Sequence, residues 1–171
     1  MSNEEIPDKD IEVILKAGIR VPDHGALNPW RLKVIKGKSL KEIDEKIILK
    51  EFLKQNPNAD KSLVERESKR LQRASVIIVV ISTPVEHFKI PTWEMQLSSG
   101  AVCMNLLSCA QSLNYAAQWL TEWYAYNENL LDYLGGDIKK DKIAGFIYIG
   151  HKIEEPTERK RPDPKEIIEY I

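Results

Sequence analysis

Hydrophobic and polar positions in the first part of the chain predict a helix followed by a strand. Between residues 8 and 20, after a proline, apolar side chains recur every three or four positions, which is the pattern of an amphipathic helix. These positions are Ile11, Ile14, Leu15 and Ile19. The pattern stops at Val21-Pro22, because proline disfavours a helical conformation in the residue before it. Residues 30–35 then alternate and predict a strand that closes at Gly37.

The following stretch of the chain is much more polar. Ser39 and Glu42 have the spacing of a capping box, which predicts a charged helix from there to residue 54. After an Asn-Pro-Asn break, a second polar helix is expected over 60–73. Its basic residues alternate with Glu65 and Glu67, so we interpret this stretch as the solvated face of a helix.

Three segments are apolar enough to be deeply buried. Residues 75–82 and 143–150 are short runs typical of strands that are buried on both faces. Residues 93–113 predict a long helix that is apolar around most of its circumference, which places it in a large core or at a subunit interface. Because the chain is too small to surround this helix, an intersubunit position is expected. Weaker patterns predict a strand over 114–119 and a helix over 127–134.

Composition and charge exclude several classes of protein. The chain has 171 residues, 43% hydrophobic and 30% charged, as expected for a single domain spanning 1–171. Its net charge of −1 provides no basic excess for a nucleic acid. No apolar run approaches the ~20 residues of a membrane span, and the acidic start does not resemble a signal peptide. We therefore expect a cytoplasmic protein in which Cys103 and Cys109 stay reduced.

Motifs of several enzyme classes are also missing from the sequence. It has no P-loop, no glycine fingerprint for a dinucleotide and no serine-hydrolase elbow. His24, His87 and His151 lack the spacing of metal ligands, so no metal site is expected. The sequence names no catalytic acid or base.

Polar side chains that can bind a ligand concentrate in the loop between the first helix and the first strand. Arg20 offers a planar fork of donors, His24 can donate or accept, and Asn28 can do both at once. Together they suit a heteroaromatic ring with alternating donors and acceptors. The alternative interpretation is structural: Asp23 caps a turn, Asn28 fixes one, and Trp30 fills the core.

This loop resembles the flavin-binding loop of the nitroreductase family, in the Pro-Asp-His form found in its short, YdjA-type branch. Four further segments resemble that family in the same order along the chain. They are residues 89–101 (the entry to the central dimer helix), 114–121 (a strand that ends in Trp-Arg-Ser in the family), 141–150 (the last core strand) and 161–164 (the tail motif). The resemblance extends over residues 6–171.

The resemblance implies a three-layer α+β fold, with a mixed central sheet flanked by helices, in an intertwined homodimer. It also implies FMN as the cofactor and NAD(P)H as the reductant. Hydride would pass through flavin N5 to a small-molecule acceptor such as a nitroaromatic or a quinone, while the protein binds and orients the flavin.

The residues implied to bind the cofactor come from three parts of the chain. Arg20, His24 and Asn28 belong to the loop. Trp119, Leu120 and Thr121 fall on the segment that reaches the flavin from the other chain, and Arg161 of the tail is a candidate for the phosphate.

The sequence departs from the family at several of these positions. The N-terminal Arg-Arg-Ser helix that grips the FMN phosphate is missing. Three explanations stay open: a start further upstream, replacement by basic residues of the tail (159–161), or loss of tight flavin binding. Asn114, Ala116 and Ala117 stand where the family has glycines, Leu120 replaces an arginine, and Glu122 replaces a glycine. The alternative function is therefore a flavin-free dimer with a ligand-binding or regulatory role.

Overall fold

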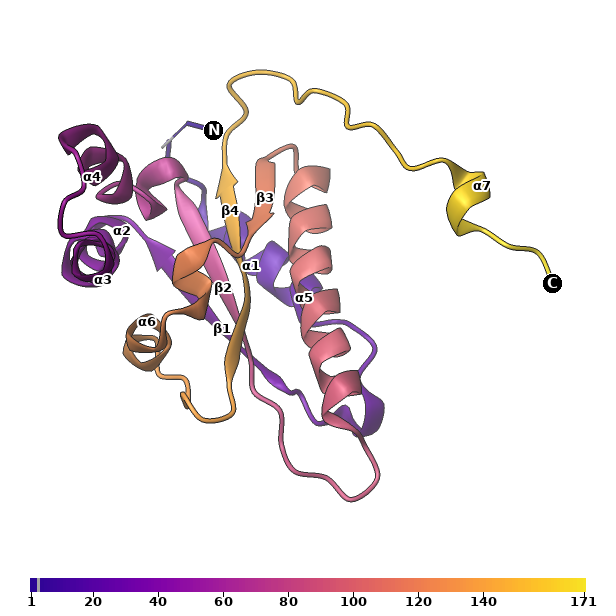
Figure 1. The fold of residues 1–171 in the computed structure, drawn as a ribbon. Coiled ribbons are helices and arrows are strands. Elements are labelled where there is room, and N and C mark those ends of the chain that lie inside the picture. Colours follow the sequence, from indigo (N-terminus) through magenta and orange to yellow (C-terminus); the bar gives the residue numbers. More distant parts are fainter. Residues whose placement is uncertain (3) are drawn as a thin grey trace.

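A four-stranded antiparallel sheet forms the centre of the molecule in a computed structural model that describes residues 1–2 and 4–171 (Figure 1). Its strands are β1 (Trp30–Lys36), β2 (Val76–Ser82), β3 (Ala116–Leu120) and β4 (Lys142–Gly150), in the order β1-β2-β4-β3. Every neighbouring pair is antiparallel. The predicted positions of the strands are confirmed, but the expectation of a mixed sheet is wrong for the strands described within one chain.

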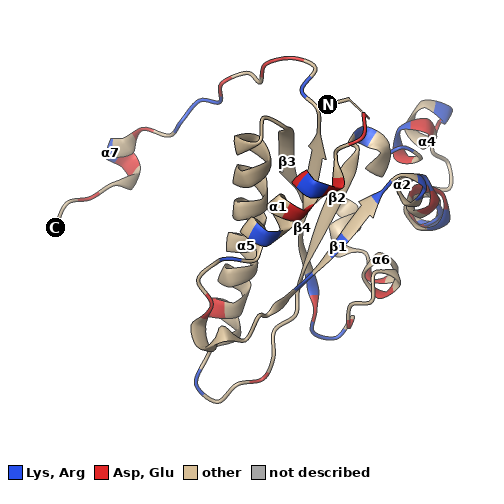
Figure 2. Cartoon of the chain, turned by 180° about the vertical axis from the view of Figure 1, so that it is seen from behind, with Lys and Arg blue, Asp and Glu red and all other residues tan. Residues whose placement is uncertain are grey.

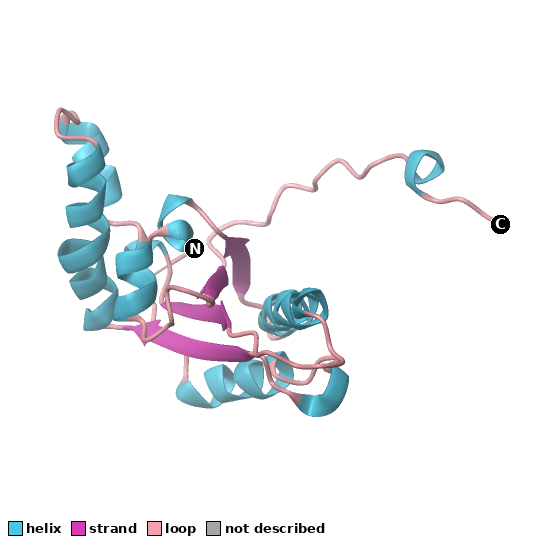
Figure 3. Ribbon diagram, turned by 60° about the horizontal axis from the view of Figure 1, so that its bottom comes forward, coloured by secondary structure: helices cyan, strands magenta, loops and turns pink. Residues whose placement is uncertain are grey.

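Helices cover both faces of this sheet, as the expected three-layer arrangement requires (Figures 1 and 3). α1 (Asp8–Gly18) and α5 (Thr92–Ser112) pack together on one face. The other face is covered by α2 (Lys38–Ile43), α3 (Leu49–Gln55), α4 (Lys61–Glu67) and α6 (Glu128–Tyr133).

β2 explains why a continuous apolar run forms a central strand. Its side chains alternate between two buried clusters, with Ile77, Val79 and Ile81 in the cluster beneath α2 and α6. Val76, Ile78 and Val80 belong to the cluster beneath α1 and α5. Because both faces of the strand are covered by helices, every residue of β2 is buried, as predicted.

The polar region between β1 and β2 differs from its prediction in two ways. Gly37, with φ +58°, precedes α2 without any side-chain cap, so the capping box at Ser39 and Glu42 is wrong. A π-helical turn, Asp44–Ile48, joins α2 to α3. The second helix is shorter than expected, because α4 ends at Glu67 and only a 3₁₀ turn, Leu71–Arg73, follows.

The chain after β4 leaves the body of the molecule. Residues 152–171 are exposed and form only the short helix α7 (Pro164–Ile167), far from the sheet (Figure 1). In the described residues, no helix has both the length and the apolar character needed to cross a membrane. Nor do three His, Cys, Asp or Glu side chains gather anywhere in that part of the chain as metal ligands would.

Candidate functional site

A polar stripe on helix α5 holds the loop that contains the candidate ligand-binding residues. Glu94, Ser98 and Asn105 are four and seven positions apart and therefore share one face of the helix. Ser98 Oγ donates to the carbonyl of Pro22 at 2.7 Å, and Asn105 Nδ2 donates to the carbonyl of Arg20 at 2.9 Å. Glu94 Oε2 lies 2.7 Å from His24 Nδ1. The helix thus fastens the loop at three points.

Inside the loop the backbone adopts conformations that most residues avoid. Gly25 has φ +73°, and a side chain there would start 2.7 Å from Ile90 Cδ1. Ala26 and Asn28 also have positive φ, at 52° and 49°. The Asp23 carboxylate accepts a hydrogen bond from the amide of Asn28 at 2.7 Å, and Asn28 Nδ2 donates to the carbonyl of Ala26 at 3.0 Å. These contacts stabilise the strained turn.

The structural interpretation of three loop residues is therefore confirmed. Asp23 caps the turn, Asn28 shapes it, and Trp30 is 6% exposed in the core. The side-chain NH₂ group of Asn28 already donates to the carbonyl of Ala26, so mainly its side-chain oxygen is left for a ligand. Arg20 and His24 differ from these three in that, among the described residues, neither side chain forms a hydrogen bond within the loop, and both are exposed. Among the described residues, the Arg20 guanidinium has no hydrogen-bond acceptor and no ion-pair partner.

The end of β3 directs neighbouring side chains to opposite faces of the sheet. The Trp119 indole lies across Gly145 on β4 and donates to the carbonyl of Ala144 at 3.1 Å. A Cβ atom at Gly145 would collide with that ring. Leu120 instead packs against the cluster beneath α2 and α6, because successive side chains of a strand alternate between faces. Thr121 follows and is exposed.

A network of charged side chains fixes the segment just after Thr121. Glu122 has φ +32° and forms ion pairs with Arg73 at 2.6 Å and Arg70 at 2.9 Å. Arg70 Nε also donates at 2.8 Å to Glu67, which accepts further hydrogen bonds from the indole N–H of Trp123 at 3.1 Å and from Arg66 at 3.3 Å. The expected solvated face is therefore wrong here, because the Glu67 and Arg70 side chains are only 2% and 14% exposed.

Burial and pairing set the pKa values of this network. Burial would raise the pKa of Glu67, but hydrogen bonds from Arg70 and Trp123 outweigh it and lower that pKa. Burial would lower the pKa of Arg73, but hydrogen bonds to Glu122 and Tyr148 outweigh this effect and raise that pKa. Hydrogen bonding to Glu67 raises the pKa of Arg70 in the same way. Both arginines are therefore fixed cations whose charge is already balanced by carboxylates.

Backbone strain marks the same two regions independently of any resemblance. In the described part of the chain, four non-glycine residues have positive φ, namely Ala26, Asn28, Asn114 and Glu122. The first two lie in the loop before β1, and the other two flank β3. Because such strain persists only where the surrounding contacts enforce it, it often accompanies a functional site. The sequence does not reveal this signal.

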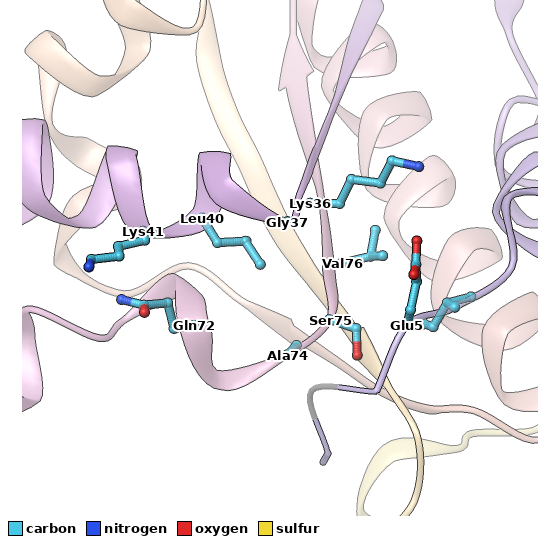
Figure 4. A pocket seen from close by; sticks show the side chains of 10 residues that line it. Glu5, Lys36, Gly37, Leu40, Lys41, Gln72, Ala74, Ser75 and Val76 are labelled. Carbon is cyan, nitrogen blue, oxygen red and sulfur yellow. The ribbon is translucent and has the colours of Figure 1, made fainter.

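Two cavities formed by described residues lie elsewhere. One of about 540 Å³ is open near the carboxyl end of β1, where Lys36, Lys41 and Gln72 surround apolar side chains (Figure 4). The candidate loop lies at the other end of this strand, roughly 20 Å away at the usual rise per residue. A second cavity, of about 410 Å³, is lined by Trp123 and Tyr126. None of the seven candidate cofactor-binding residues lines either cavity.

The structure brings only some of the sequence-predicted site residues together. Arg20, His24 and Asn28 share the loop, and Trp119 lies on the same face of the sheet as α5, next to Gly100. Leu120 faces the other layer. Arg161 lies in the extended tail and pairs with Glu158 at 2.6 Å, away from the other six (Figure 1).

Sequence reasoning missed the α5 stripe that orders the loop. Glu94, Ser98 and Asn105 are polar positions at helical spacing in an apolar helix, and this pattern was available in the sequence. The Arg70–Glu122 contact joins residues that are far apart in sequence, so no local pattern indicates it.

Comparison with known proteins agrees with this architecture. A sequence model of the Nitroreductase family matches residues 1–151, and the chain therefore belongs to that family. YdjA of Escherichia coli (strain K12), provisionally named an NAD(P)H nitroreductase, is 29% identical over 168 residues, covering 95% of this chain and 87% of the relative.

Solved structures show the same fold. A nitroreductase-like family protein from Bacillus cereus has a TM-score of 0.81 and 20% identity, covering all of this chain and 88% of the other. A nitroreductase with bound FMN from Bacteroides fragilis NCTC 9343 has a TM-score of 0.72 and 22% identity, covering 99% and 90%. The nitroreductase-like fold expected from the sequence is thereby confirmed.

Proposed function

We propose that this chain is an FMN-dependent oxidoreductase that passes hydride from NAD(P)H to a nitroaromatic, quinone or similar acceptor. The observation that carries the proposal is the loop before β1. Its strained backbone is fixed by α5, and it carries an exposed His24 and an Arg20 guanidinium that pairs with none of the described residues. Family membership and the FMN-bound relative support the same activity.

The loop residues fit the ring system of FMN. A planar guanidinium matches the carbonyl edge of such a ring, and an imidazole beside it can donate or accept a hydrogen bond. FMN, when bound, supplies the hydride chemistry at its N5 atom. The chain's own residues bind and orient the ring, and Trp119 offers a partly exposed aromatic surface, 38% accessible.

We further propose that two copies of the chain form the working unit. Trp93, Leu97 and Met104 lie on one face of α5 and are 65%, 53% and 51% exposed, an apolar stripe that a single chain leaves uncovered. Figure 2 shows that α5 is almost without charge, whereas the α2–α4 region carries both signs. The extended tail presents Ile167, Ile168 and Tyr170 to solvent. A second copy would cover both surfaces and bring its Trp119–Thr121 segment to the loop.

The experiment for this proposal uses the purified full chain. FMN titration should produce saturable flavin binding and raise the melting temperature by mass action. The loaded protein should then oxidise NADH or NADPH when a quinone or nitroaromatic is added, and light scattering should report a dimer. A protein that stays colourless in excess FMN, with an unchanged melting temperature, would rule out the enzyme assignment.

One observation favours the second candidate, a flavin-free dimer that binds another ligand. Near the end of β3, Leu120 faces the core and the charges of Arg70 and Arg73 are balanced by Glu67 and Glu122. The two arginines described there are therefore already paired and are not free to bind an anionic cofactor. A dimer that fails to bind FMN would support this function. In either case we propose a cytoplasmic location, which the two free cysteines favour.

A further inference from the structure

The contact between His24 and Glu94 has a chemical consequence beyond holding the loop. The two residues are 70 positions apart, and their contact at 2.7 Å joins the strained loop to the first turn of α5. An ionised carboxylate can only accept hydrogen bonds. The ring nitrogen that faces it, Nδ1, must therefore carry the hydrogen.

The opposite ring nitrogen is then free for a ligand. No other hydrogen bond to the His24 ring is present among the described residues, and its side chain is half exposed. In a neutral imidazole, one nitrogen donates and the other accepts. Because Glu94 holds the hydrogen on Nδ1, Nε2 presents a lone pair to solvent.

We propose that Glu94 is a positioning residue that fixes His24 as a hydrogen-bond acceptor for the imide N–H of a planar ring. The Arg20 guanidinium can donate only, and it comes from the same loop. A donor and an acceptor supplied by one loop match the two kinds of group on an imide edge, in which a carbonyl lies next to an N–H. This inference rests on the proposed function and specifies which edge of the flavin the loop recognises.

The loop geometry supports a fixed rather than a mobile imidazole. Gly25 and Ala26, directly after His24, both have positive φ, and Ser98 bonds the carbonyl of Pro22 on its other side. The backbone on both sides of the ring is therefore restrained, so one hydrogen bond to Glu94 suffices to set the ring's orientation and tautomer.

The test compares FMN with a flavin mononucleotide methylated at N3, which has lost the imide hydrogen. Wild-type protein should bind FMN at least tenfold more tightly than the methylated analogue. Glu94→Gln should reduce this preference to about twofold or less, because a glutamine amide can either accept from Nδ1–H or donate to a bare Nδ1 and so no longer keeps the hydrogen off Nε2. His24→Ala should abolish the preference in the same way.

Glu86→Gln is the matched control, because Glu86 lies on the exposed segment before α5 and its side chain forms no hydrogen bond or ion pair with a described residue. It makes the same charge change and should keep the full preference for FMN. Equal preferences in wild type and Glu94→Gln, or a loss in Glu86→Gln as large as in Glu94→Gln, would overturn the proposal.

A second measurement needs no flavin. The ¹⁵N chemical shifts of the His24 ring in the protein alone should show hydrogen on Nδ1 in wild type and a shift toward the Nε2 tautomer in Glu94→Gln. Hydrogen on Nε2 in the neutral wild-type ring would overturn the role of Glu94 even if FMN binds. Failure of wild type to bind either flavin would overturn the proposed function and the ligand class, while the shifts would still report on the Glu94–His24 pair.

Discussion

The loop before β1 and the segment after β3 are both strained, but they are held in opposite ways. The loop is fastened by hydrogen bonds from Ser98 and Asn105 of α5 to its carbonyl groups and by the contact of Glu94 with His24. None of the described residues pairs with the Arg20 guanidinium. The segment after β3 is fastened by ion pairs of Glu122 with Arg70 and Arg73. The loop therefore keeps the Arg20 cation available to a ligand, whereas the arginines beside the segment after β3 are already balanced by carboxylates.

This difference separates binding from stability. A cation without a protein partner gains most of its interaction energy from a ligand, whereas breaking a buried ion pair mainly destabilises the fold. We therefore expect changes in the loop to act on ligand affinity. Changes around Glu122 should act first on the free energy of unfolding.

The largest effect is expected from Glu67→Gln. Removing one member of a buried ion pair costs about 3–5 kcal/mol of unfolding free energy, and the Glu67 side chain is 2% exposed beside Arg70. Urea denaturation measures the loss. Glu65→Gln is the control, because Glu65 is exposed and pairs only with Lys69, so its loss should stay below about 1 kcal/mol.

The pH dependence of the same variant tests the pairing directly. The pKa of Glu67 is lowered in the fold, so its stabilisation is present above the pKa of the unfolded state and is lost as the pH falls through the folded pKa. Burial raises the pKa of Asp44, so its protonation at low pH favours the folded state. This contribution is the same in wild type and Glu67→Gln and cancels in their difference. The stability difference between wild type and Glu67→Gln should therefore shrink as the pH is lowered. A difference that is constant down to strongly acidic pH would contradict the ion-pair account.

Gly145→Ala should have the next largest effect. A methyl group there collides with the Trp119 indole, and overpacking of this kind costs about 1–3 kcal/mol. The ring should swing away from β4 and become more exposed. The expected signal is a red shift of tryptophan fluorescence, and this shift should be absent when Gly145→Ala is made in a Trp119→Phe background. Gly100→Ala is the control, because its Cβ would lie 3.9 Å from the same ring and alanine favours a helix. Unchanged emission in Gly145→Ala would show that the ring position is not fixed by close packing.

Glu122→Ala should destabilise the protein by about 1–2 kcal/mol, since it loses both ion pairs while alanine keeps the unfavourable positive φ. Glu122→Gly loses the same pairs but adopts this φ without strain. It should therefore be less destabilised than the alanine variant. Equal melting temperatures for the two variants would show that backbone strain at this position is negligible.

The smallest effect on stability is expected from Ser98→Ala. It removes one hydrogen bond to the Pro22 carbonyl, worth about 1 kcal/mol, and should accelerate amide hydrogen exchange in residues 20–26. Ser112→Ala is the control on the same helix, because its hydroxyl bonds only within α5. Unchanged exchange in the loop would mean that the α5 stripe does not hold it.

Much of the fold could be predicted because its signals are local. The run at residues 76–82 and the alternation at 30–35 identify their strands directly, and Pro22 identifies the loop after the first helix, which ends at Gly18 rather than at residue 20 as predicted. The strand order and the antiparallel pairing required the structure. So did the burial of Glu67 and Arg70, because a charged residue in a helix appears solvated until its distant partner, here Glu122, is known.

The candidate site likewise contains residues that could be predicted from the sequence and residues that could not. Arg20 and His24 could be named from their residue types in a proline-containing loop. The role of Glu94 could not, because its partner is 70 residues away. Leu120 was placed at the flavin by its sequence position, but the alternation of β3 turns its side chain toward the opposite core.

We propose that the loop before β1, whose Arg20 guanidinium pairs with none of the described residues, binds the flavin, while the segment after β3 stabilises the fold. The most direct test is the dissociation constant of FMN for Arg20→Ala, with Lys16→Ala on the preceding helix α1 as the charge-matched control. Losing a charge-assisted hydrogen bond of about 1.5–3 kcal/mol weakens binding roughly ten- to a hundredfold. The account predicts this loss for Arg20→Ala, at an unchanged melting temperature without FMN, and less than a twofold change for Lys16→Ala. Equal FMN affinity in wild type and Arg20→Ala would contradict it.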